Sequence, residues 1–171
     1  MKNISVKNKN TKHIYSRGLG LIEIIVGTSI ITLSMVGLIT TFSFFMRAGL
    51  ANTERIKAIY ILEESTEAFR YMRDAGWTTD ITTLSKDVPY HLVVNNSNWE
   101  ATTTESLIDD MFDRTITIVD VYRRNSDSDI VASTSPDSKT LDPNTVEVTA
   151  KVAWNENEVK STTYLTNIFN N

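Results

Sequence analysis

The sequence predicts an α+β protein in which a long N-terminal helix packs on a small antiparallel sheet. Three observations lead to this class. Residues 24–46 contain no charged side chain, a helical period continues from them to Ala75, and the residues beyond 77 form short alternating segments between turn residues. The helix is therefore expected first and the sheet second.

The uncharged stretch runs for 23 residues, from Ile24 to Met46. As a helix it spans roughly 35 Å, enough to cross a bilayer core of about 30 Å. A secretory signal peptide has a shorter apolar core and a small-residue cleavage site, and no such site follows Met46. Small and hydroxyl residues inside the stretch favour helix-to-helix packing in lipid. These are Gly27, Thr28, Ser29, Thr32, Ser34, Gly37, Thr40, Thr41 and Ser43.

After Arg47 the helical pattern continues without proline up to Gly76, which predicts the end of the helix. Apolar residues recur three to four positions apart, and charged residues occupy the opposite side. The apolar set is Leu50, Ile56, Ile59, Leu62, Ala68, Phe69 and Met72. We expect one helix over Leu19–Ala75, about 85 Å long, with residues 19–47 as the membrane-spanning part and 48–77 as the amphipathic part.

Residues 78–171 are predicted to form an antiparallel-sheet domain. Val146, Val148, Ala150, Val152 and Trp154 alternate on one face of the clearest strand. The short turn at residues 155–158 predicts that this strand pairs with the next one as a hairpin. The expected strands are Tyr90–Val94, Thr115–Tyr122, Ile130–Val131 after a turn at Asn125–Asp129, Thr145–Trp154 and Val159–Ile168.

Charge is distributed unevenly along the chain. The first 18 residues hold five of the 17 Lys and Arg residues and no acid, which leaves 12 basic against 21 acidic residues beyond them, or about −9. A basic leader before an apolar stretch keeps the N-terminus in the cytoplasm. The acidic remainder argues against nucleic acid as a partner. The absence of cysteine excludes disulfides, thiolate catalysis and Cys-ligated zinc; no cofactor and no metal are predicted.

Before the apolar stretch stands Arg17-Gly18-Leu19-Gly20-Leu21-Ile22-Glu23. This segment resembles the cleavage motif of prepilins in the type IV pilin and pseudopilin superfamily, in which a basic leader ends in Gly and Glu stands five residues later. The resemblance implies that a membrane aspartyl peptidase cuts the Gly18–Leu19 bond and removes residues 1–18. It also implies N-methylation at Leu19 and pairing of Glu23 with the Leu19 amine of a neighbouring subunit.

Glu23 is unusual on physical grounds alone. A carboxylate deep in lipid costs about 2.5–3.5 kcal/mol, so it needs a partner. Cleavage after Gly18 creates an amine at Leu19, four residues away. Since both charges would lie in an apolar bundle, their pairing is expected to set register more than to add stability. The alternative is a Glu at the interface of a simple membrane anchor.

The resemblance also implies partners and a location. The chain would be a structural subunit, not an enzyme, that forms a helical homo-oligomeric filament. Its partners would be a prepilin peptidase, a platform membrane protein and an assembly ATPase. It would lie in the inner membrane with its C-terminal domain outside, and then in an extracellular pilus.

Three departures leave the type of subunit open. Leu19 replaces the usual Phe, the apolar helix lacks proline, and a C-terminal cysteine pair is missing. A major pilin, a minor pilin and a type II secretion pseudopilin all remain possible. The alternative from another class is an uncleaved, single-pass membrane-anchored binding module.

Other candidate sites are set aside. Asn125–Asp129 resembles a calcium loop but lacks the Gly and the terminal Glu of an EF-hand, so a solvated turn is expected. His91 has no nucleophile and carboxylate linked to it by the sequence, and no catalytic residue is predicted. Trp77, Trp99 and Trp154 are expected in the core or at subunit contacts.

Overall fold

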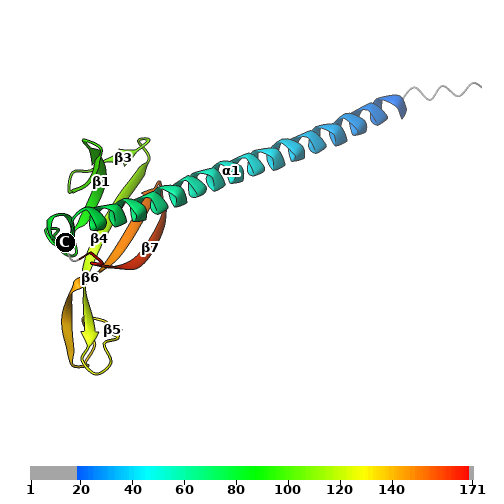
Figure 1. The fold of residues 1–171 in the computed structure, drawn as a ribbon. Helices are drawn as coiled ribbons and strands as arrows, with labels where there is room; N and C mark the ends of the chain where they lie inside the picture. The colour runs from blue at the N-terminus through cyan, green and yellow to red at the C-terminus, as the bar shows by residue number, and fades with distance from the viewer. Residues whose placement is uncertain (1–18, 170–171) are drawn as a thin grey trace, which may run out of the picture. The chain divides into compact units, whose positions relative to one another are not determined.

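The structure, a computed structural model, describes residues 19–169 and the side chains of residues 20–169. The described chain forms one long helix, α1 (Leu19–Ala75), followed by a short helical turn and a seven-stranded antiparallel sheet (Figure 1). It divides into two compact units, of which the first ends at Leu50 and the second begins at Ala51. The predicted α+β class is confirmed.

The predicted end of α1 at Ala75 is confirmed, but Gly76 does not end it through a left-handed conformation. Gly76 is extended, with φ −175° and ψ 98°, and its N–H still bonds to the Met72 carbonyl at 3.1 Å. The chain then enters a π-helical turn, η1 (Trp77–Ile81). A Cβ atom on Gly76 would lie 2.2 Å from Thr79 Oγ1, so a larger residue here would require the Thr79 side chain to move.

The sheet has the strand order β2-β1-β4-β6-β7, and β3 and β5 also pair with β4. Every pairing is antiparallel. The predicted hairpin is present as β6 and β7, which meet at Trp154 and Asn157. The strands are β1 (Pro89–Asn95), β2 (Asn98–Thr102), β3 (Leu107–Ile108), β4 (Phe112–Arg124), β5 (Ile130–Val131), β6 (Lys139–Trp154) and β7 (Asn157–Thr166).

The structure extends most of the predicted strands and adds β2 and β3. The sequence of β2, NWEAT, has no strand pattern of its own, and it becomes a strand by pairing with β1. The turn between β6 and β7 has two residues where four were predicted, so β7 begins at Asn157. All six glycines precede Trp77, and polar residues therefore take the positive φ of the turns. These residues are Asp87, Asn96, Ser97, Asp109, Asp110, Ser128 and Asn155.

The core lies between one face of the sheet and the part of α1 that belongs to the second unit (Figure 1). Alternate residues of β6 from Val146 to Trp154 all point into it, as predicted, and none is more than 5% exposed. Each fully buried large apolar side chain contributes about 1.5–3 kcal/mol. From α1 the core receives Ala58, Ile61, Leu62, Ala68, Phe69 and Met72.

Beyond the part of the sheet that α1 covers, the ends of β4 and β6 form an arm with β5 (Figure 1). The pairing of β4 with β6 shifts register between Asp120 and Val121. The arm comprises residues 121–142 and continues the same two strands past this irregularity. Val121 is buried in it, and hydrogen bonds between polar side chains accompany the backbone pairing of β4 with β5 and β6.

Candidate functional site

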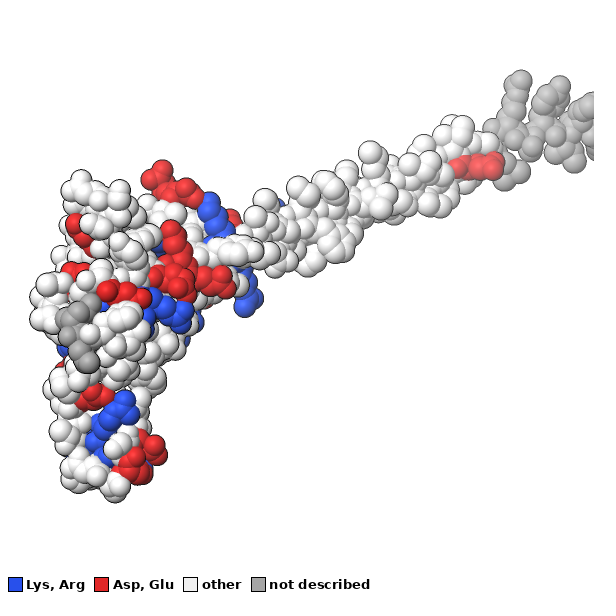
Figure 2. Space-filling model, viewed as in Figure 1, with Lys and Arg blue, Asp and Glu red and all other residues white. Residues whose placement is uncertain are grey.

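The first part of α1 carries a continuous apolar surface. From Gly20 to Leu50 every described residue is exposed except Gly27, which is half-buried. The large side chains in this part, such as Ile24, Leu33 and Phe44, are all more than half exposed. This helix, near the N-terminus, is long and apolar enough to cross a membrane by length and composition. Figure 2 shows its first part as an almost uncharged surface, while Lys, Arg, Asp and Glu gather over the sheet unit.

The hydroxyl side chains in this stretch are satisfied by the helix itself. Each of the seven donates to the backbone carbonyl four residues earlier, as Thr28 does to Ile24 at 2.8 Å and Ser34 to Ile30 at 2.8 Å. A hydroxyl bonded in this way costs little to place in lipid, because no polar group is left without a partner. The hydroxyls therefore do not weaken the stretch as a membrane segment.

The predicted processing site lies at the edge of the described residues. Gly18 lies outside them, and so does the basic leader of residues 1–18. Leu19 is the first residue of α1, and Glu23 is exposed one turn later. Within residues 19–169 the Glu23 carboxylate takes part in no hydrogen bond or ion pair. The described part of one chain therefore supplies no partner for this charge.

The buried face of the second part of α1 differs in part from the one its sequence pattern indicates. Leu62, Ala68, Phe69 and Met72 are buried, as expected. Ile56 and Ile59, however, are 55% and 39% exposed, because Ala58 and Ile61 face the sheet instead. Together with Tyr60, which is 66% exposed, they form an uncovered apolar surface on this unit. Sequence spacing alone did not separate this surface from the core face.

Arg114 connects α1 to the sheet. Its guanidinium donates to Glu64 Oε2 at 3.1 Å and to the Leu92 carbonyl at 2.7 Å, and it lies 5.1 Å from the centre of the Trp99 ring. Burial lowers the pKa of Arg114, and the charge and hydrogen bond of Glu64 oppose that effect. No spacing rule links residues 64, 92, 99 and 114, so the sequence did not predict this contact.

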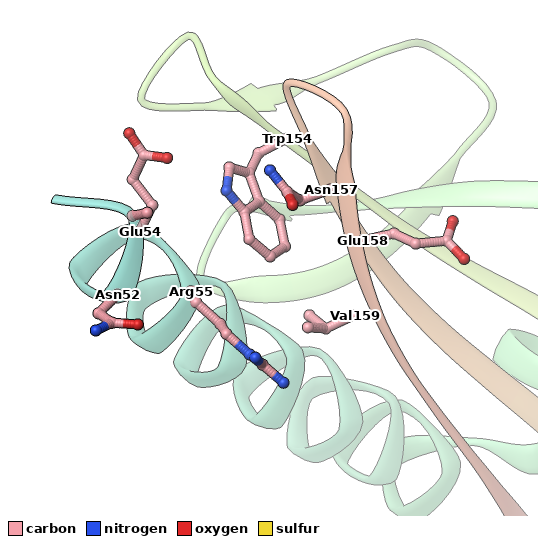
Figure 3. A pocket seen from close by; sticks show the side chains of 8 residues that line it. Asn52, Glu54, Arg55, Trp154, Asn157, Glu158 and Val159 are labelled. Carbon is pink, nitrogen blue, oxygen red and sulfur yellow. The ribbon is translucent and has the colours of Figure 1, made fainter. Parts of the chain in front are cut away.

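A pocket of about 400 Å³ lies between the start of the second unit and the β6–β7 hairpin. In Figure 3, Glu54 and Arg55 leave α1 in different directions near the Trp154 ring, Asn157 lies beside that ring, and Glu158 points away from the helix. Within the described residues, neither the Glu54 carboxylate nor the Arg55 guanidinium has an ion-pair or hydrogen-bond partner. The lining residues are Ala51, Asn52, Glu54, Arg55, Trp154, Asn157, Glu158 and Val159.

The loop that resembles a calcium site is organised by arginine. Arg124 donates to Asp127 at 2.7 Å and to Asp137 at 2.9 Å, and Arg123 donates to Asp142 at 2.6 Å. These guanidinium groups neutralise the carboxylates that a cation would need. Among residues 19–169 no group of three His, Cys, Asp or Glu side chains is placed to hold a metal ion.

His91 and the three tryptophans lie in the buried part of the second unit or at its edge. His91 is 9% exposed, and its Nδ1 lies 3.3 Å from Asp113 Oδ1. Neither atom forms a hydrogen bond within the described residues. Trp77 and Trp154 are core residues, and Trp99 is half-buried at the edge of the core.

Comparison of the chain with models of protein families, with curated proteins and with solved structures finds no match.

Proposed function

We propose that this chain is the precursor of a structural subunit of a type IV pilus-like filament. In this proposal a prepilin peptidase removes residues 1–18, the new Leu19 amine is methylated, and a platform membrane protein and an assembly ATPase raise the subunit from the inner membrane. The subunits then polymerise through α1. The observation that carries the proposal is Glu23, a carboxylate of α1 without a partner in the described chain, directly before the exposed, uncharged stretch of that helix.

The chemistry of the filament core supports this assignment. Twenty-three uncharged residues with satisfied hydroxyls can lie in lipid before assembly and against like helices after it. In an apolar bundle Glu23 needs a cation, and the amine released at Leu19 is the one that processing creates. Ile56, Ile59 and Tyr60 form an uncovered apolar surface of the second unit, which a neighbouring subunit would cover.

Mass spectrometry of the native protein tests the processing step. We expect a chain that begins at Leu19 and carries one added methyl group. A chain that keeps residues 1–18 would falsify the filament assignment and favour an uncleaved, membrane-anchored binding module. A chain that begins at Leu19 but makes up only a small fraction of the protein in filaments sheared from cells would identify a minor pilin or a secretion pseudopilin.

Substitution of Glu23 tests the assembly step. We expect Glu23→Gln to leave the chain cleaved and inserted but to lower the yield of filaments at least about tenfold, because the paired charge is lost. Glu63→Gln, the same change at an exposed position of the same helix, serves as the matched control and is expected to assemble normally. Filaments of normal yield and register from Glu23→Gln would show that the carboxylate has no role in assembly.

A further inference from the structure

We propose that a groove between α1 and the β1–β2 hairpin binds a neutral hexose unit of a glycan. The groove encloses about 350 Å³, within the range of roughly 300–1,000 Å³ that is usual for small-molecule sites. It lies wholly within the second unit, and the inference needs neither cleavage nor polymerisation. We call it the Tyr71–Trp99 groove, and its lining residues are Glu64, Glu67, Ala68, Tyr71, Ser97 and Trp99.

One wall of the groove is a single stripe of side chains on α1. Its four lining residues stand at positions i, i+3, i+4 and i+7 of the helix and therefore share one face. Ala68 is only 2% exposed and belongs to the core, whereas Tyr71 is 50% exposed. This wall therefore combines a closed apolar surface with an accessible aromatic ring and two carboxylates.

The β1–β2 hairpin supplies the other wall. Trp99 lies opposite Val94 in the register of this hairpin and packs at the edge of the core. The buried Arg114 guanidinium lies 5.1 Å from the centre of the Trp99 ring, and the Tyr71 hydroxyl donates to Asn98 Oδ1 at 3.4 Å. These contacts hold both rings in place before a ligand arrives, so binding requires little ordering of the walls.

The charges that line the groove are already paired. Glu64 accepts a hydrogen bond from Arg114, and Glu67 accepts one from Arg70. A cationic ligand would compete with these arginines, and an anionic ligand would be repelled by the carboxylates. Each paired carboxylate still has lone pairs that can accept hydrogen bonds from hydroxyl groups. The groove therefore favours an uncharged ligand that carries several hydroxyls.

A hexose ring matches the chemistry of both walls. The faces of the ring present C–H bonds, which can pack on aromatic side chains, and its rim carries hydroxyl groups. These hydroxyls can donate to Glu64 and Glu67, and they can exchange a hydrogen bond with the Ser97 hydroxyl. A wholly apolar ligand would cover the same rings but would shield the carboxylates from water without giving them hydrogen bonds, which is unfavourable.

Titration of the full chain with simple sugars tests this assignment. The chain is reconstituted in phosphatidylcholine nanodiscs, which contain no sugar. The neutral probes are the methyl glycosides of glucose, galactose and mannose, and the charged probes are those of glucosamine and glucuronate. We expect at least one neutral glycoside to bind with a Kd of about 1 mM, measured by tryptophan fluorescence, and both charged glycosides to bind at least about fivefold more weakly.

Substitutions at two exposed lining residues separate the contributions of ring and carboxylate. Tyr71→Ala should lower the affinity about tenfold, whereas Tyr71→Phe keeps the ring and should stay within about twofold of the unaltered chain. Glu67→Gln should also lower the affinity about tenfold, through the loss of one charge-assisted hydrogen bond. Since both side chains are exposed, thermal unfolding should show an intact fold in each variant.

Two matched variants outside the groove serve as controls. Tyr164→Ala removes a ring of similar exposure, 47%, from β7, and Glu63→Gln removes an exposed carboxylate from α1. Both should bind the neutral glycoside like the unaltered chain. Absence of binding by all three neutral glycosides overturns the assignment, as does unchanged affinity in Tyr71→Ala. Tighter binding of either charged glycoside overturns the choice of a neutral ligand.

The outcome is separable from that of the filament proposal. A chain that keeps residues 1–18 but binds a neutral glycoside in the Tyr71–Trp99 groove refutes the filament and leaves the glycan site standing. A chain that is cut at Leu19 and assembles, but binds none of the glycosides, refutes the glycan site alone.

Discussion

Arg114 joins α1, β1, β2 and β4 through its side chain. It extends from β4 to Glu64 on α1 and to the backbone of Leu92 on β1, and it stacks over Trp99 on β2. Only 8% of its side chain is exposed, whereas 54% of the Glu64 side chain is. The interaction is therefore buried on the arginine side and screened by solvent on the carboxylate side. Loss of the carboxylate would leave a buried guanidinium with less compensation.

We predict that Glu64→Gln lowers the free energy of unfolding of the second unit by about 1–2 kcal/mol. Urea denaturation followed by tryptophan fluorescence measures this, since all three tryptophans lie in that unit. Glu63→Gln, one residue earlier and exposed, is the control and should change stability by less than about 0.5 kcal/mol. Equal effects of the two substitutions would contradict the role assigned to Arg114.

At the scale of elements, the arm of residues 121–142 contains several arginine–carboxylate hydrogen bonds. The hydrogen bond from Arg124 is the main reason that the pKa of Asp137 is lowered. The pKa of Asp127 is lowered first by the Asp129 N–H and then by Arg124. Burial raises the pKa of Asp142, but hydrogen bonds from Arg123, Thr145 and the Asn144 N–H together lower it.

These directions give a pH dependence for the arm. A carboxyl group whose pKa is lower in the folded state stabilises that state above its unfolded pKa, about 3.9, and this contribution is lost as pH falls through the folded value. The arm should therefore keep its structure at neutral pH and loosen below about pH 4.

We predict that Arg124→Gln raises the pKa of Asp137 toward its ordinary value, and that of Asp127 less. Carboxyl chemical shifts followed by NMR during acid titration measure each group separately. Arg123→Gln is the matched variant: it should raise the pKa of Asp142 and leave that of Asp137 unchanged. A uniform shift of all three groups in both variants would show that the pairs do not act independently.

At the scale of the whole molecule, the two units use apolar side chains in different ways. Along the sequence, the buried residues of this core begin at Ala58 and end at Leu165, so they all belong to the second unit. None of the large apolar side chains between Gly20 and Leu50 belongs to that core, and the membrane-capable part of the helix is not buried. The second unit therefore obtains its packing without help from the first.

We predict that residues 51–171 alone form a soluble, monomeric unit that unfolds cooperatively. Analytical ultracentrifugation and urea denaturation test this, with the chain of residues 19–171 as the comparison, which should require detergent to stay dispersed. A fragment that is unfolded without residues 19–50 would mean that α1 needs its first part to pack on the sheet.

Several features of this chain follow from local sequence. Periodicity and charge are patterns of neighbouring residues. They predict the bounds of α1, the apolar stretch within it and the alternating face of β6. The cleavage motif around Gly18, Leu19 and Glu23 is likewise local, and its function stays a prediction.

Other features depend on residues that are far apart in the chain. The strands β2 and β3 exist because β1 and β4 offer unpaired edges, and the helix face at Ala58 and Ile61 is buried because the sheet lies on that side. The pocket brings Arg55 near Trp154, about one hundred residues later. Local sequence thus determined the long helix and the main strands. The tertiary structure decided which apolar side chains stay exposed and which charges stay unpaired, because exposure and pairing depend on packing between distant segments.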